Sequence, residues 1–107
     1  MKYSVSLVEG AEDDLFDIYR YVAEADSLTK AEKLLENIEN VCSNLAEFPD
    51  RGHLPPELER VGILSYRQVC FKPYRIIYQI IEKNIFIHCI LDGRRDMEEI
   101  LYHRMLR

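Results

Sequence analysis

The stretch that decides the fold is residues 64–91, LSYRQVCFKPYRIIYQIIEKNIFIHCIL. It contains three runs that are rich in Ile, Val, Tyr and Phe: residues 64–71, 74–82 and 85–91. A turn-forming dipeptide follows each run: Lys72-Pro73, Lys83-Asn84 and Asp92-Gly93. Runs of this composition that are joined by such short turns predict an antiparallel meander of three strands.

The chain before the meander is predicted to form a short strand and a first helix. Tyr3, Val5 and Leu7 alternate with polar residues, which indicates a strand with one buried face. From Ala11 onward the apolar residues recur at helical spacing, and acidic residues occupy the first turn, where the helix dipole favours them. This helix is expected to end near residues 25–26.

A second amphipathic helix is expected from residue 29 to residue 45. Thr29 and Glu32 have the spacing of a capping box, and Pro49 stops the helix. Two helices joined by so short a turn run antiparallel, and their apolar stripe needs another layer to cover it. The sequence therefore predicts a helical hairpin packed on the sheet.

The remaining segments complete a β-α-α-β-β-β-α order. Residues 48–62 contain the Pro and Gly of a loop, with one short helical turn expected at residues 56–60. Residues 96–106 begin with acidic and end with basic side chains, which is typical of a last short helix. We expect an α+β fold in which a helical hairpin packs on a small, mainly antiparallel sheet, as a single domain over residues 1–107.

The composition agrees with one compact core and argues against general nucleic-acid binding. The chain has 107 residues, 48% hydrophobic and 31% charged, with a net charge of -5. Residues 1–50 hold 12 acidic and 4 basic residues, whereas residues 51–107 hold 7 acidic and 10 basic ones. A protein whose whole surface clamped nucleic acid would be basic throughout, so any basic surface is confined to the second half.

The cysteines and the lengths of the apolar runs indicate the cellular compartment of the protein. The three cysteines form no Cys-x-x-Cys pair and stand among apolar neighbours, so we expect inert, packed thiols in a reducing cytoplasm: Cys42, Cys70 and Cys89. No run approaches the ~20 apolar residues that a membrane helix needs. We therefore expect a cytoplasmic protein with no membrane partner.

The sequence predicts neither a metal site nor a cofactor. The nucleotide-binding glycine loop, the G-x-S-x-G elbow and the H-E-x-x-H motif are all absent from it. His53, His88 and His103 have no ligand-like spacing. His88 lies between apolar residues of a strand, and a hydrogen-bonded structural role fits it better than a role as a base.

A set of arginines in the second half could instead carry function. Arg67 and Arg75 lie on adjacent predicted strands, and Arg94 and Arg95 follow the third, so strand pairing could bring them onto one sheet surface. Such a cluster suits phosphate or the carboxylates of an acidic protein segment. In the structural alternative, Arg75 pairs with one of two nearby carboxylates, Asp92 or Asp96, Arg95 is also held by structural pairing, and most of the other arginines are solvated.

Three motifs together resemble the RelE/ParE superfamily of toxin–antitoxin toxins. They are the helix end Leu45-x-x-Phe48-Pro49-x-x-Gly52, the strand YRIIYQI at residues 74–80 and the strand exit ILDGRRD at residues 90–96. The similarity covers nearly the whole chain and has the same order of elements. It implies a toxin that a cognate antitoxin neutralises by direct binding.

The superfamily divides into two activities. RelE-like members cut messenger RNA on the ribosome, using basic residues on the sheet and a tyrosine or histidine near the C-terminus. By this resemblance the catalytic set would be Arg67, Arg75, Arg95 and His103. However, Val69 stands where a lysine would be expected, and Leu101 occupies the position of the usual tyrosine, one residue before Tyr102.

ParE-like members lack that chemistry and inhibit DNA gyrase. The acidic pI near 5.2 also departs from the habit of the RNA-cutting members, so the resemblance is closer to ParE. We expect a gyrase-inhibiting toxin with no catalytic residue, and a surface that faces the target or the antitoxin: Arg67, Arg75, Arg94, Arg95 and Tyr102. The alternatives are a ribosome-dependent mRNA endoribonuclease and a non-toxic module that retains only antitoxin binding.

Overall fold

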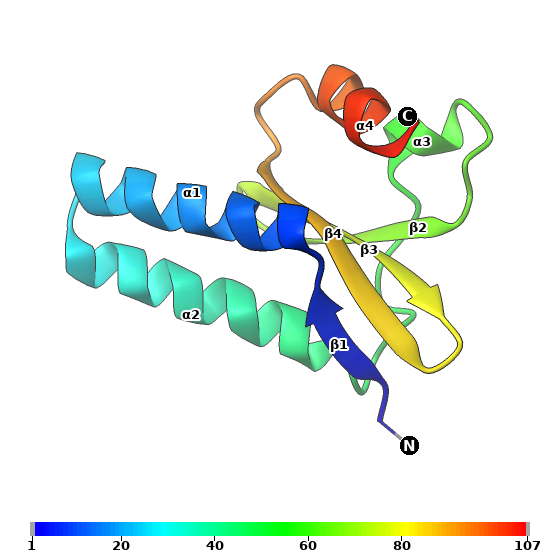
Figure 1. Ribbon diagram of the computed structural model, residues 1–107, viewed down its shortest axis with the longest axis horizontal. Helices are drawn as coiled ribbons and strands as arrows, with labels where there is room; N and C mark the ends of the chain where they lie inside the picture. Colours follow the sequence, from blue (N-terminus) through cyan, green and yellow to red (C-terminus); the bar gives the residue numbers. More distant parts are fainter. Residues whose placement is uncertain (1, 107) are drawn as a thin grey trace.

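The computed structural model describes residues 2–106 and shows a twisted four-stranded sheet with helices against both faces (Figure 1). In chain order the elements are β1 (Ser4–Leu7), α1 (Glu9–Ala25), α2 (Leu28–Asn44), α3 (Pro56–Glu59), β2 (Tyr66–Phe71), β3 (Tyr74–Ile81), β4 (Asn84–Asp92) and α4 (Met97–Met105). The strand order is β1-β4-β3-β2, in which β1 runs parallel to β4 and the other pairs are antiparallel. The predicted α+β fold with a mainly antiparallel sheet is confirmed.

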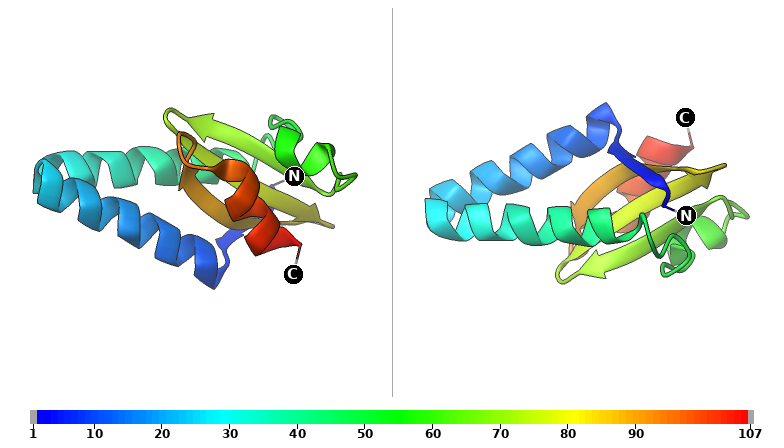
Figure 2. Two further views of the ribbon diagram at one scale, coloured as in Figure 1. Left: turned by 90° about the horizontal axis from the view of Figure 1, so that it is seen from above. Right: turned by 90° about the horizontal axis from the view of Figure 1, so that it is seen from below.

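The helical hairpin extends well beyond the sheet (Figures 1 and 2). α1 and α2 are both 17 residues long, and each has an apolar stripe that faces the sheet or the other helix. The predicted capping box at Thr29 is wrong, because α2 begins earlier. Ser27 has an extended backbone (φ -154°), and its hydroxyl accepts from the Lys30 amide at 3.1 Å, so Ser27 is the N-cap.

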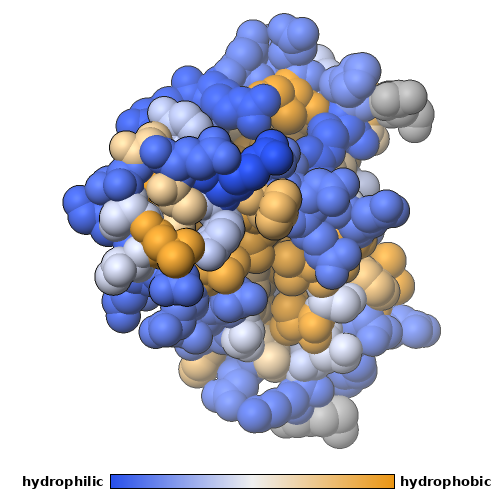
Figure 3. Space-filling view, turned by 60° about the vertical axis from the view of Figure 1, so that its left-hand side comes forward, coloured by the Kyte–Doolittle hydropathy of each residue, from blue (hydrophilic) through white to orange (hydrophobic). Residues whose placement is uncertain are grey.

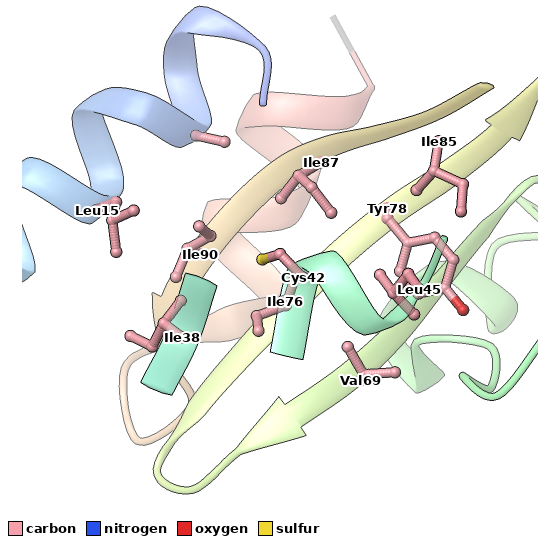
Figure 4. Close-up of a cluster of buried hydrophobic side chains, with 11 residues drawn as sticks. Leu15, Ile38, Cys42, Leu45, Val69, Ile76, Tyr78, Ile85, Ile87 and Ile90 are labelled. Carbon is pink, nitrogen blue, oxygen red and sulfur yellow. The ribbon is translucent and has the colours of Figure 1, made fainter. Parts of the chain in front are cut away.

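The main core lies between the hairpin and one face of the sheet (Figure 4). Apart from a bulge in β4, side chains alternate between the two faces along each strand, so every second strand residue points toward the helical hairpin. The buried side chains of this core include Leu15, Ile38, Cys42, Leu45, Val69, Ile76, Tyr78, Ile85, Ile87 and Ile90. Burial of these apolar side chains is the main favourable contribution to folding, and it fixes the hairpin on the sheet.

The other face of the sheet is covered by α3 and α4, which lie side by side (Figure 2). A second apolar cluster joins them to the strands: Leu58, Ile77, Cys89, Leu91, Met97 and Leu101. The Asp96 side chain caps α4 by accepting from the Glu99 amide at 3.2 Å. Both faces of this sheet are therefore occupied by the chain itself.

An ion pair joins α1, β4 and α4. Arg104 donates to both oxygens of Asp14 at 3.1 and 3.0 Å, and also to the His88 carbonyl at 2.8 Å. Asp14 in addition accepts from the Ile90 amide at 3.0 Å. These contacts give hydrogen-bond partners to the Ile90 amide and the His88 carbonyl of β4. Both groups lie beyond the end of β1, where no further strand pairs with that side of β4.

His88 is the bulged residue of β4. Ile77 of β3 pairs with Cys89, and the next residue, Tyr78, pairs with Ile87. His88 is therefore left without an opposite residue on β3. Its ring is hydrogen-bonded to Gln79 at 3.2 Å, and burial, with the nearby Arg104 charge, lowers its pKa. The structural role predicted for His88 is confirmed.

The thiols divide into two classes. Burial raises the pKa of Cys42 and of Cys89 to about 12, as expected for packed, unreactive thiols. The expectation of a packed thiol is wrong for Cys70, which is exposed on the edge strand β2. Between residues 2 and 106, no helix has both the length and the apolar character that spanning a bilayer demands.

Candidate functional site

The register of the sheet separates the predicted arginines. Arg67 pairs with Tyr78, whose side chain belongs to the core under the hairpin, whereas Arg75 pairs with Cys70 and faces α3. Opposed residues of two strands share a face, and positions 67 and 70 are an odd number of residues apart. Arg67 and Arg75 therefore lie on opposite faces, and the expected single arginine surface does not form.

Arg75 is held in a largely buried network on the α3 side. Its two terminal nitrogens donate to the two oxygens of Glu57 at 2.9 and 2.7 Å, and its Nε donates to Gln68 at 2.8 Å. Only 14% of each of the Arg75 and Glu57 side chains is exposed. The Arg75 hydrogen bonds lower the pKa of Glu57, which keeps this pair charged.

The partner of Arg75 differs from the predicted one. Neither Asp92 nor Asp96 pairs with it, because Asp92 is bonded to Arg94 and Asp96 caps α4. Glu57 takes that place because α3 folds back across the strands. Arg75 therefore has a structural carboxylate partner, but the predicted partners Asp92 and Asp96 are wrong.

Arg67 fixes the loop that follows α2. It donates to the Gly52 carbonyl at 2.9 Å, and Asp50 lies 3.9 Å away. The same loop is bound by the Tyr78 hydroxyl, which accepts from the Gly52 amide at 3.1 Å and donates to the Pro49 carbonyl at 2.7 Å. Arg67 thus has a structural contact, although 39% of its side chain is exposed.

Arg94 and Arg95 form an exposed corner between β4 and α4. Arg94 donates to both oxygens of Asp92 at 3.0 and 2.7 Å, and this bonding lowers the pKa of Asp92 to about 2. The backbone amide of Arg95 donates to the Asp92 carbonyl at 3.1 Å. The Arg95 guanidinium is exposed at the surface.

Two grooves run along this corner. One, of about 300 Å³, lies between α1 and the end of β4, and its lining includes Tyr21, Tyr74, Ile90, Arg94 and Arg95. The second, of about 430 Å³, runs on toward α4 and brings Arg95 together with His103. Figure 3 shows apolar side chains in the middle of one face of the molecule, among hydrophilic ones. Tyr102 lines a third, shallow hollow with Glu98 and Glu99.

The structure thus brings Arg94, Arg95 and His103 together around one corner and leaves Arg67 and Arg75 elsewhere. In the described part of the chain, no three His, Cys, Asp or Glu side chains are grouped so that they could hold a metal ion. The prediction missed Glu57 and the pair of Asp14 with Arg104. No sequence signal connects Asp14 with Arg104, because the two are 90 residues apart.

Comparison of the sequence with known proteins points to one family. Residues 5–97 match the family model of the ParE toxin of type II toxin–antitoxin systems, parDE. Toxin ParE3 of Caulobacter vibrioides is 31% identical over 88 residues, which cover 78% of this chain and 80% of that protein.

Two solved structures share the fold. The chromosomal ParDE toxin–antitoxin system from P. aeruginosa superposes with a TM-score of 0.69 at 21% identity, over 83% of this chain and 94% of that one. The toxin–antitoxin complex RelBE2 from Mycobacterium tuberculosis gives a TM-score of 0.62 at 17% identity, over 84% and 96% of the two chains. The family model covers most of the chain, and the chain therefore belongs to the ParE toxins of type II toxin–antitoxin systems.

Proposed function

We propose that this ParE-type toxin inhibits DNA gyrase by binding it, without chemistry of its own, and that a cognate antitoxin neutralises the toxin by direct contact. The observation that carries the proposal is that the Arg75 guanidinium is not free to bind a substrate. Its guanidinium is already bound by Glu57 and Gln68 inside the protein, where it is largely buried.

This arrangement disfavours the alternative, a ribosome-dependent mRNA endoribonuclease. An RNA cutter stabilises its transition state with cations that converge on the reacting phosphate. Arg67 and Arg75 face opposite sides of the sheet, and α3 and α4 cover the side on which Arg75 lies. A phosphate at Arg75 would have to displace Glu57 and replace two charged hydrogen bonds.

The surface that remains for a macromolecule favours a protein partner. Around Arg94 and Arg95, apolar Ile90 and the rings of Tyr21 and Tyr74 line the groove together with charged groups. Aromatic and arginine side chains around an apolar floor are the composition of protein–protein hot spots. We assign this corner to the gyrase-facing surface, with the exposed side of α4, which carries Tyr102, beside it.

The deciding experiment is DNA supercoiling by purified gyrase with added toxin. The wild-type chain should stop supercoiling and leave cleaved DNA bound to gyrase, and the double variant Arg94→Ala/Arg95→Ala should lose this effect at an unchanged melting temperature. Lys33→Ala/Arg51→Ala is the matched control, because it removes the same charge from exposed positions away from that corner and from α4. It should inhibit like the wild type.

Two other outcomes would overturn the proposal. Cleavage of mRNA on purified ribosomes, with no effect on gyrase, would establish the endoribonuclease. No effect in either assay, together with a stable complex with the antitoxin, would establish the non-toxic module. Antitoxin binding itself is tested by co-expression with the product of the neighbouring small open reading frame, followed by size-exclusion chromatography.

A further inference from the structure

The groove of about 300 Å³ at the Arg94–Arg95 corner has one wall that belongs to the helical hairpin. α1 continues past the end of the sheet (Figure 1), and its side chains Ile18 and Tyr21 form this wall. These two residues are three apart and therefore lie on one face of the helix. The opposite wall consists of residues from the start of β3, the end of β4 and the loop that follows: Tyr74, Ile90, Leu91, Asp92, Arg94 and Arg95.

The groove has an apolar floor and an exposed aromatic ring beside it. Ile90 is 1% exposed and Ile18 is half-buried, so the floor is continuous with the main core. The Tyr21 side chain is 72% exposed, although its ring is one of the larger apolar surfaces of α1. A large apolar side chain of a partner could pack on this floor and be covered by the Tyr21 ring.

Two hydrogen-bond donors of the groove are unused. The Tyr74 hydroxyl and the Arg95 guanidinium make no hydrogen bond to another group of residues 2–106, and Arg95 has no ion pair there. Burial and the nearby Asp92 charge raise the pKa of Tyr74, so its hydroxyl keeps its proton at neutral pH. Both groups can therefore donate to an acceptor that a partner brings into the groove.

The charges of the lining leave one positive charge over. Each of its three carboxylates has a cation nearby: Asp14 with Arg104, Asp92 with Arg94, and Asp17 with Arg20. Within the described residues, Arg95 is the charge of the lining that these pairs do not use. A single carboxylate complements this arrangement. A nucleic-acid strand fits it less well, because its row of phosphates would also meet the aspartates.

We propose that this groove binds a segment of gyrase in which a large apolar side chain is adjacent to an Asp or Glu. The inference rests on the proposed inhibition of gyrase and deepens it by naming the chemistry of the bound segment. The apolar side chain packs on the floor beneath Tyr21, the carboxylate pairs with Arg95, and the Tyr74 hydroxyl donates to the segment. The free end of α1 is then part of the target-binding surface.

The test compares two single variants, Tyr21→Ala and Arg95→Gln, in DNA supercoiling by purified gyrase. Each variant should need about tenfold more toxin than the wild type for the same inhibition, because each removes one anchor of the segment. Both side chains are exposed, so the melting temperature should not change.

Each variant has a matched control. Phe16→Ala also removes an exposed ring from α1, but Phe16 lies on a different face of the helix and lines another groove. Lys33→Gln removes one positive charge from an exposed position on α2, outside the groove. Both controls should inhibit gyrase like the wild type.

The sign of the partner charge is tested by Arg95→Glu. This variant should bind gyrase more weakly than Arg95→Gln, because its carboxylate repels that of the segment. In biolayer interferometry with immobilised toxin, higher salt should weaken binding of the wild type more than binding of Arg95→Gln. Equal affinities of the Gln and Glu variants would show that the partner group is not a carboxylate.

The outcomes separate this inference from the proposed function. If the wild-type toxin does not inhibit gyrase, the proposed function is wrong. If the wild type inhibits and both groove variants inhibit equally well, gyrase binds elsewhere and only the groove inference is wrong. If the toxin binds a labelled DNA duplex and Arg95→Gln abolishes that binding, the groove takes phosphate instead of a protein segment.

Discussion

Replacing Arg75 by Met is expected to destabilise the protein, whatever it does to toxicity. The variant keeps most of the apolar stem that packs against Gly93, but it removes the bonds to Glu57 at 2.7 and 2.9 Å and the bond to Gln68. Charged hydrogen bonds contribute about 1.5–3 kcal/mol each, and losing one partner of a buried pair costs about 3–5 kcal/mol. Because water can reach part of Glu57 once the arginine is gone, we expect a loss of about 2–3 kcal/mol in the free energy of unfolding.

The pH dependence gives an independent check on the same pair. The pKa of Glu57 is lowered in the folded protein, so the pair contributes fully above the unfolded-state value of about 4.3. This contribution is lost as the pH falls through the lowered folded pKa. The difference between wild type and Arg75→Met should therefore be largest near neutral pH and shrink in acid.

The assay is urea unfolding, followed by circular dichroism at several pH values. Arg20→Met is the control, because its pair with Asp17 is 3.9 Å long and 61% of the Arg20 side chain is exposed. It should change the free energy of unfolding by less than about 0.5 kcal/mol. The reasoning fails if Arg75→Met unfolds like the wild type at every pH and yet abolishes toxicity, since Arg75 would then be a functional group.

Three further changes test other parts of the structure. Tyr78→Phe leaves the Gly52 amide and a loop carbonyl without their partner, so urea unfolding should show a loss of about 2 kcal/mol. Arg104→Met should loosen α4 before the rest of the fold, which hydrogen exchange of its amides would report as a local loss of protection; uniform loss would contradict this. In thiol titration with a disulfide reagent, exposed Cys70 should react in the native protein, whereas Cys42 and Cys89 should react only in denaturant.

Most of the fold could be predicted because local patterns determine it. The three strands and their turns follow from apolar runs and turn dipeptides, and the helices follow from their spacing of apolar residues. The start of α2 was misplaced because Ser27 and Thr29 are both good caps, and only the backbone conformation of Ser27 decides between them.

The candidate site could be predicted less well because it depends on long-range geometry. Strand pairing was expected to gather Arg67 and Arg75, but which face each occupies depends on the register across the turn at residues 72–73. Likewise, the choice of Glu57 as the partner of Arg75 depends on the path of the loop before β2. The corner of Arg94 and Arg95 was easier to predict, since it directly follows a strand and depends on no distant pairing.

The parallel pairing of β1 with β4 has a consequence for how the protein folds. Val5 and Ile85 are partners in the sheet although they are 80 residues apart, and closing a loop of that length costs about 4 kcal/mol of chain entropy. The meander and the hairpin can form from nearby segments, so we expect β1 to dock late, after the rate-limiting step. Substitutions in β1 should then speed unfolding and leave the folding rate nearly unchanged, and until β1 docks, the apolar β4 strand has an open edge that is prone to aggregation.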